Sequence, residues 1–327
     1  MKILVYGAGV IGSVYAARLL EAGHQVTVLA RGKRLDDIRR YGLVLKDVIS
    51  GIQSTTQVTA INQLTTSDQY DVILISVRRD QLASVIPALK ANQGAADLVF
   101  MLNNPLGSGD LVQEFGQNRV ILGFPGLGGA EERGGVQYAM IAQQPTTLGE
   151  MNGRQSSRVI DLAKTFRAAG FATRIEPHMD AWLKTHAFFV TAISGAIYLA
   201  GGNCHQLSLD KAKLSLMTKG VREGFNVVNQ LGMTVTPLSL RILFTWMPQL
   251  FAVYYWHRYL SSEMADYVFG RHARRASLEM QMLANDCRTL MMQSQVETPA
   301  LLKLYTAVDA FANQNHGVNA INFVAPL

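Results

Sequence analysis

A glycine-rich turn directly after the first apolar run constrains this chain more than any other feature. Residues 1–6 are mostly apolar, and Gly7-Ala8-Gly9-Val10-Ile11-Gly12 follows them, before a stretch with apolar residues at helical spacing. This order of strand, tight turn and helix is typical of dinucleotide-binding folds, in which the second glycine lets the backbone approach a pyrophosphate. The helix N-terminus attracts the same anion. The pattern therefore predicts a dinucleotide site, and the alternative is a glycine-rich turn that binds no ligand.

The end of the second predicted strand, residues 25–29, indicates which dinucleotide is preferred. Folds that take NAD usually place an Asp or Glu there to bind the ribose 2′-hydroxyl. Here the segment reads Ala30-Arg31-Gly32-Lys33-Arg34, and no acid occurs before Asp36. Because an arginine can donate two charge-assisted hydrogen bonds to a 2′-phosphate, Arg31 favours NADPH over NADH. The alternative is that these residues are solvated surface cations.

Strand and helix signals alternate through the first half of the chain. Three further apolar runs have the length of buried strands: residues 71–77, 98–102 and 120–124. A predicted helix, residues 82–89, follows the first run, and a glycine-rich loop, residues 125–135, follows the last. Alternation of this kind predicts a doubly wound parallel sheet that binds ligands at the carboxyl ends of its strands. The residues expected along that rim are Gly7, Arg31, Arg78, Asn104 and the loop from Gly123 to Ala130.

Long apolar stretches at helical spacing replace the strand-like runs after residue 176. The chain of 327 residues, with 49% hydrophobic residues, is large enough for two cores. We therefore expect an α/β class protein: a Rossmann-type dinucleotide-binding domain over residues 1–176 and a mostly α-helical domain over residues 177–327. Within the second, residues 238–256 carry a single charge, Arg241, and many aromatic side chains. They are interpreted as a buried helix pair, a dimer interface or a wall of a substrate pocket.

Charge and cysteine content restrict the partners. A net charge of +6 fits an anionic ligand such as NADPH and an acidic substrate, whereas no basic run interleaved with stacking aromatics points to nucleic acid. The two cysteines, Cys204 and Cys287, have neither a disulfide pattern nor metal-ligand spacing, so no metal is expected. The chain shows no signal peptide, and the cytoplasm is the expected compartment. A helix-rich second domain leaves a homodimer open.

The chain as a whole resembles the ketopantoate reductase family of NADPH-dependent 2-oxo acid reductases, through the glycine turn, Arg31 and the motifs that follow. The resemblance implies that Arg78 lies near the coenzyme phosphates. It implies that Asn104, in Asn104-Pro105-Leu106-Gly107, meets the ribose and the reacting centre, although Pro105 replaces the family's glycine. It also implies that Ala130 lies beside the nicotinamide.

The same resemblance assigns two catalytic residues to the helical half. Lys184, in Asp180-Ala181-Trp182-Leu183-Lys184, looks like the family's catalytic lysine, whose ammonium stabilises the alkoxide and donates the proton after hydride transfer. Glu279 looks like the family's glutamate, which orients that lysine or holds the nicotinamide ribose.

Three positions depart from the family pattern in the expected substrate site. Phe188 and Ala192 stand where the family has asparagines that bind the substrate, and Tyr267 stands where it has a serine. Loss of such hydrogen bonds changes substrate selection strongly. The leading hypothesis is reduction of a 2-oxo acid, as in pantothenate biosynthesis. The alternatives are a reductase of a bulkier, more hydrophobic ketone, a non-catalytic NADPH sensor, and a membrane-associated or assembly protein that uses residues 238–256.

Overall fold

The computed structural model describes residues 1–132, 135–141 and 144–316. Contacts divide the chain into two compact units, Met1–Asp180 and Ala181–Leu327, and each is described by itself. The division follows Asp180, whereas the sequence placed the domain boundary after residue 176.

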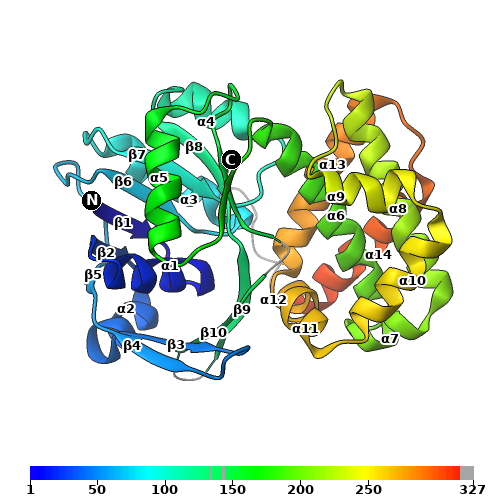
Figure 1. Ribbon diagram of the computed structural model, residues 1–327, viewed down its shortest axis with the longest axis horizontal. Helices are drawn as coiled ribbons and strands as arrows, with labels where there is room; N and C mark the ends of the chain where they lie inside the picture. Colours follow the sequence, from blue (N-terminus) through cyan, green and yellow to red (C-terminus); the bar gives the residue numbers. More distant parts are fainter. Residues whose placement is uncertain (133–134, 142–143, 317–327) are drawn as a thin grey trace, which may run out of the picture. The chain divides into compact units, whose positions relative to one another are not determined.

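The first unit is built on an eight-stranded sheet with the order β12-β11-β8-β7-β6-β1-β2-β5 (Figure 1). Its strands are β1 (Lys2–Tyr6), β2 (Gln25–Leu29), β5 (Thr59–Ile61), β6 (Val72–Ile75), β7 (Asp97–Met101), β8 (Val120–Phe124), β11 (Thr146–Gly149) and β12 (Thr173–Ile175). Six neighbouring strands run parallel to one another, in the order β8, β7, β6, β1, β2 and β5. Strand β11 pairs antiparallel with β8. The predicted parallel sheet is confirmed.

Helices cover this sheet, which explains why its central strands are apolar on both faces. They are α1 (Val10–Glu21), α2 (Gly32–Tyr41), the short 3₁₀ turn η1 (Arg79–Gln81), α3 (Leu82–Ala91), α4 (Ser108–Phe115) and α5 (Ser157–Ala168). Helices α1 and α5 are neighbours (Figure 1). The Tyr15 ring of α1 lies 5.2 Å from the Phe166 ring of α5, measured between ring centroids. Tyr15 also stacks on Phe171 at 4.1 Å. This aromatic contact fixes the first helix, and with it the glycine turn, against the rest of the unit.

A second sheet has the strand order β4-β3-β10-β9 and corrects one expectation. Its strands are β3 (Leu43–Asp47), β4 (Gln53–Thr56), β9 (Leu127–Glu132) and β10 (Gly135–Met140). The prediction of a loop over residues 125–135 was wrong, because residues 127–132 form β9, which pairs antiparallel with β10 through Ala130 and Gln137. A Cβ at Gly129 would strike the Gln137 carbonyl and come within 3.0 Å of the Val10 side chain. The glycine here marks a close approach rather than a turn.

Helices are the regular secondary structure of the second unit over its described residues, as expected. Its elements are α6 (Met179–Leu199, which begins in the first unit), α7 (Cys204–Leu209), α8 (Lys211–Gln230), α9 (Leu238–Arg241), the π-helical turn η2 (Ile242–Trp246), α10 (Gln249–Leu260), α11 (Glu263–Ala265), the π-helical turn η3 (Asp266–Gly270), α12 (Arg271–Arg275), α13 (Ser277–Ser294) and α14 (Pro299–His316). Glycines let α6, α8 and α14 approach closely: a Cβ at Gly195 would lie 2.7 Å from the Leu304 carbonyl oxygen, and one at Gly220 would lie 2.6 Å from the Leu304 side chain.

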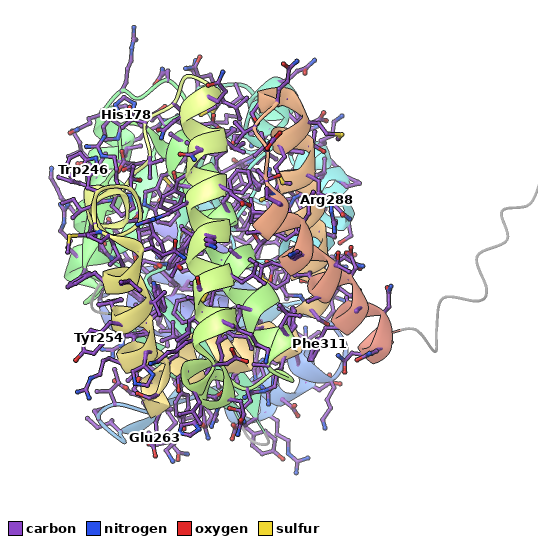
Figure 2. The ribbon with its side chains drawn as sticks, turned by 90° about the vertical axis from the view of Figure 1, so that its right-hand side faces the viewer. His178, Trp246, Tyr254, Glu263, Arg288 and Phe311 are labelled. Atoms are coloured by element: carbon purple, nitrogen blue, oxygen red, sulfur yellow. The ribbon has the colours of Figure 1, made fainter. Side chains whose placement is uncertain are left out.

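The aromatic segment over residues 238–256 is only half buried. Phe244 and Trp256 lie in the core, whereas Trp246 is 64% exposed and Tyr254 is 63% exposed. Figure 2 shows Trp246 and Tyr254 on one side of α8, away from Arg288 and Phe311. Of the three interpretations of this segment, a helix pair buried in the core does not hold for the exposed face of α10, because periodicity cannot show whether another element covers that face. The dimer interface and the wall of a substrate pocket stay predictions. No helix among the described residues is long and apolar enough to cross a membrane.

Candidate functional site

The glycine turn joins β1 to α1, and two of its glycines are required by the packing of the protein itself. Gly7 has a φ of +106°, which L side chains rarely adopt. A Cβ at Gly12 would strike the Gly7 carbonyl oxygen and approach the Ser76 Oγ at 2.5 Å. These two positions therefore bring α1 close to the ends of β1 and β6.

Gly9 differs, because the described residues give no packing reason for a glycine there. Its φ of −71° suits any residue, and a Cβ would meet only the Glu131 Oε1 within 4 Å, at 3.5 Å. The space beside Gly9 therefore fits a group that arrives from outside the protein. Gly9 is also the N-cap of α1, whose first turn begins with Val10 and Ile11, contains no acidic residue and is capped by no described side chain. Such a helix end favours an anion.

The N-terminus of a second helix, α2, also lies at this edge of the sheet and carries several cations. Arg31 is the N-cap of α2, is exposed, and donates from Nη2 to the Tyr6 hydroxyl at 3.2 Å. Lys33 and Arg34 follow in the first turn, which contains no acidic residue. Cations are unfavourable next to the positive N-terminal end of a helix dipole. A bound anion would neutralise this positive charge, so the arrangement favours an anion.

Arg34 was not singled out by the sequence analysis, yet its side chain contacts the glycine turn directly. Its Nε donates to the Ala8 carbonyl oxygen at 3.0 Å, and its Nη2 donates to the Ser13 Oγ at 2.9 Å. The sequence did contain a signal for Arg34. Acidic residues are favoured in the first turn of a helix, so a cation in the first turn of α2 is unusual.

The remaining residues of the expected rim follow β6 and β7. Arg78 is bound by its neighbour Asp80, with Nε 3.1 Å from Oδ1 and Nη2 3.2 Å from Oδ2. Asn104 is buried and its Oδ1 accepts from the Gly107 amide at 3.2 Å. Because β7, β6, β1 and β2 are adjacent parallel strands, their carboxyl ends bring these residues and the glycine turn to one edge of the sheet. Ala130 is buried in β9 rather than in a loop, one residue from the Glu131 that borders Gly9.

In the second unit, both proposed catalytic residues are buried charges. Lys184 lies in the second turn of α6, and Glu279 lies in the first turn of α13. Each residue is 8% exposed. Lysine and glutamate are seldom buried to this extent unless they are paired or functional. The Glu279 Oε2 lies 3.8 Å from the His272 Nε2.

Two histidines that the sequence analysis did not consider lie in the same region. The His186 ring stacks on Trp182 with 5.0 Å between centroids. Desolvation and, to a smaller extent, the nearby His272 lower the pKa of His186 to about 3, so it is neutral near neutral pH. His186 stands two residues after Lys184, and that proximity in sequence was the available signal.

Two of the three positions that depart from the family pattern are completely buried, and the third, Tyr267, is half buried. Phe188 and Ala192 are completely buried on α6. A Cβ at Gly224 of α8 would come within 2.7 Å of the Phe188 side chain, so the missing side chain at Gly224 makes room for the ring. Tyr267 lies in the π-helical turn η3, under the Arg271 guanidinium, which is 3.8 Å from its ring centroid.

No group of histidine, cysteine, aspartate or glutamate side chains in the described part of the chain could hold a metal ion. A parallel sheet with a glycine turn at its rim is the architecture of dinucleotide-binding folds. Residues 3–153 match the family model described as "Ketopantoate reductase PanE/ApbA". Over these residues the chain matches the ketopantoate reductase family of oxidoreductases, for which a nicotinamide cofactor is typical.

Curated relatives are distant in sequence. An uncharacterised oxidoreductase of Bacillus subtilis, YkpB, is 26% identical over 197 residues, which cover 60% of this chain and 64% of that protein. The 2-dehydropantoate 2-reductase of Aquifex aeolicus is 25% identical over 232 residues, which cover 70% of this chain and 73% of the relative. At these identities the relatives show what the chain is similar to, and the substrate is left to be proposed.

Solved structures share the fold over nearly the whole chain. The 2-dehydropantoate 2-reductase of Geobacter metallireducens superposes with a TM-score of 0.78 at 17% identity, covering 95% of this chain and 99% of that one. A ternary structure of D-mandelate dehydrogenase with NADH and anilino(oxo)acetate gives 0.76 at 16% identity, with 96% and 99% covered. The predicted fold class, a Rossmann-type sheet followed by a helical unit, is confirmed.

Proposed function

We propose that this oxidoreductase reduces a 2-oxo acid to a 2-hydroxy acid with NADPH, the same type of reaction that converts ketopantoate to pantoate. The observation that carries the proposal is the buried Lys184 on α6, which by the resemblance of the sequence corresponds to the family's catalytic lysine. Conversion of a carbonyl into an alcohol needs a proton for the oxygen, and a desolvated ammonium group is a suitable donor.

The coenzyme half of the proposal rests on the rim of the sheet. The backbone of Ala8, Gly9, Val10 and Ile11 would face the diphosphate, because the space beside Gly9 is open and α1 begins there without an acidic residue. Arg31 would bind the 2′-phosphate, which gives NADPH its preference over NADH. The other proposed contacts are Gly7 and Gly12 through the shape of the turn, Arg78 to the phosphates, Asn104 to the ribose and Ala130 beside the nicotinamide.

The nicotinamide supplies the hydride when the coenzyme is bound. Lys184 would stabilise the developing negative charge on the substrate oxygen and donate a proton from Nζ. Glu279 would orient that ammonium group or the ribose. Its carboxylate lies in the first turn of α13, the end of a helix at which negative charge is stabilised, and 3.8 Å from His272.

A bulkier, more hydrophobic substrate is the second candidate, and Phe188 and Ala192 favour it. Both replace amides that would bind a small polar hydroxy acid, and both are buried among apolar groups. The structural neighbour D-mandelate dehydrogenase was solved with anilino(oxo)acetate, an aromatic 2-oxo acid derivative. If ketopantoate is instead the substrate, the protein would serve pantothenate biosynthesis.

The test is NADPH oxidation by the purified protein against a panel of 2-oxo acids that includes ketopantoate and phenylglyoxylate. We expect turnover of at least one member, and we expect Lys184→Ala to lower kcat by about 10²–10⁴-fold without weakening NADPH binding. Lys303→Ala, an exposed lysine of α14 in the same unit, is the control and should leave kcat unchanged.

Two outcomes would overturn the proposal. Undiminished turnover by Lys184→Ala would remove the lysine from the chemistry. Tight NADPH binding with no turnover of any 2-oxo acid or ketone would favour a non-catalytic NADPH sensor.

A further inference from the structure

A closed ring of hydrogen bonds holds the glycine turn from the side of α2. Arg34 donates from Nε to the Ala8 carbonyl oxygen at 3.0 Å and from Nη2 to the Ser13 Oγ at 2.9 Å. The Ser13 hydroxyl in turn donates to the same Ala8 carbonyl oxygen at 3.0 Å. One carbonyl oxygen in the middle of the turn therefore accepts from two side chains, one of which is charged. Hydrogen bonds from a charged donor are the stronger kind.

The carbonyl that is held belongs to the peptide bond between Ala8 and Gly9. In a trans peptide the carbonyl and the N–H lie in one plane and point in opposite directions. A fixed Ala8 carbonyl therefore fixes the direction of the Gly9 N–H, which starts the open side of the turn. The neighbouring carbonyl oxygens have partners of their own, since that of Gly7 accepts from the Ser76 Oγ at 2.9 Å and that of Gly9 accepts from the Ser13 amide at 3.0 Å. The Ala8 carbonyl between them is the one that Arg34 and Ser13 hold.

Arg31 and Arg34, three residues apart on α2, are used differently. Arg31 is exposed and makes one contact of 3.2 Å with the Tyr6 hydroxyl. Arg34 is half buried, and two of its nitrogens bind protein acceptors on the glycine turn. The first arginine is placed to meet a ligand, and the second is committed to the protein.

We propose that Arg34 is a positioning residue that fixes the Ala8–Gly9 peptide in the orientation needed for the coenzyme diphosphate. It acts through the backbone and not on the 2′-phosphate, which is left to Arg31. This inference rests on the proposed nicotinamide dinucleotide site. Arg34, which acts at the diphosphate, would set the affinity for any dinucleotide. Arg31, which acts at the 2′-phosphate, would set the choice between NADP and NAD.

The test measures binding of NADP⁺, NAD⁺ and 2′-AMP to the full-length protein by titration calorimetry. We expect Arg34→Ala to weaken NADP⁺ and NAD⁺ by the same factor, about tenfold, and to leave 2′-AMP, which has no diphosphate, unchanged. Arg31→Ala should weaken NADP⁺ and 2′-AMP while sparing NAD⁺. Arg39→Ala is the matched control on the same helix, since Arg39 contacts only the Ala60 carbonyl among the hydrogen bonds of the described residues, and it should change none of the three.

Two further variants separate positioning from general stability. Arg34→Lys should not restore binding, because one ammonium group cannot reproduce the two-pronged contact with Ala8 and Ser13. Ser13→Ala removes one arm of the ring without removing charge, and it should weaken NADP⁺ and NAD⁺ equally but less than Arg34→Ala. If Arg34→Ala does not fold, Ser13→Ala carries the test alone.

The inference is overturned if Arg34→Ala binds both dinucleotides as the parent does, or if it loses NADP⁺ and 2′-AMP but keeps NAD⁺. The second result would make Arg34 a direct ligand of the 2′-phosphate. Failure of the unmodified protein to bind any dinucleotide would instead overturn the proposed coenzyme site, so the two failures are distinguishable.

Discussion

The sheet rim of the first unit and the α6 face of the second unit keep their family resemblance to different extents. At the rim, the glycine turn has the spacing and backbone geometry of a dinucleotide site, and Gly9 leaves open space beside it. On α6, Lys184 is buried at the position that the sequence resemblance gives to the family's lysine, but Phe188 and Ala192 are buried as core residues. The two regions therefore differ in how closely they follow the family pattern: the proposed coenzyme site keeps it, and the proposed substrate site does not.

The largest expected effect concerns Phe188. Because its ring fills the space left by Gly224, Phe188→Asn should lower the free energy of unfolding by about 3–5 kcal/mol, through lost apolar contact and a buried amide. Urea unfolding measures this. Phe251→Asn, at a ring that is 46% exposed on α10, should cost far less. Equal, small losses for both variants would mean that Phe188 is a replaceable pocket residue and would remove the contrast between the two regions.

Gly9 and Gly12 sharpen the comparison within the rim. Gly12→Ala should destabilise the protein by about 1–3 kcal/mol, since its Cβ would strike the Gly7 carbonyl. Gly9→Ala should leave the unfolding midpoint nearly unchanged, because its Cβ meets only Glu131 at an ordinary contact distance, yet it should weaken NADPH binding. Thermal unfolding with and without NADPH separates the two effects. Unimpaired NADPH binding by Gly9→Ala would argue against a ligand at this turn.

A smaller effect should appear on acidification. The pKa of His186 is lowered to about 3 in the folded protein, whereas an unfolded histidine titrates near pH 6.5. Between these values the unfolded chain binds the additional proton, so stability falls as the pH drops below about 6.5. We expect a loss of about 1 kcal/mol between pH 7 and pH 5.5, measured by urea unfolding. The loss should diminish in His186→Gln and persist in His205→Gln, a control at an exposed histidine. An unchanged slope in His186→Gln would assign the pH dependence to other groups.

The parts that sequence predicted best depend on short-range geometry. The glycine turn and the strand signals at β1, β2, β6, β7 and β8 are local patterns, and the structure contains all of them. The contact of Arg34 with Ala8 joins residues 26 apart, and the burial of Phe188 depends on a glycine of α8. Neither the Arg34–Ala8 contact nor the burial of Phe188 can be predicted from the periodicity of apolar residues. Strand β9 was missed because its glycines resemble a turn until the partner strand is known.

The most direct test of the account compares kcat/KM for phenylglyoxylate and for ketopantoate, with NADPH as the coenzyme. The account predicts NADPH oxidation with at least one of the two acids, and the second candidate function predicts a higher kcat/KM for the aromatic acid, because α6 lacks the two amides. NADPH oxidation with neither acid would contradict the account. A kcat/KM for ketopantoate well above that for phenylglyoxylate would reject the bulkier substrate, since the substrate site would then work without those amides.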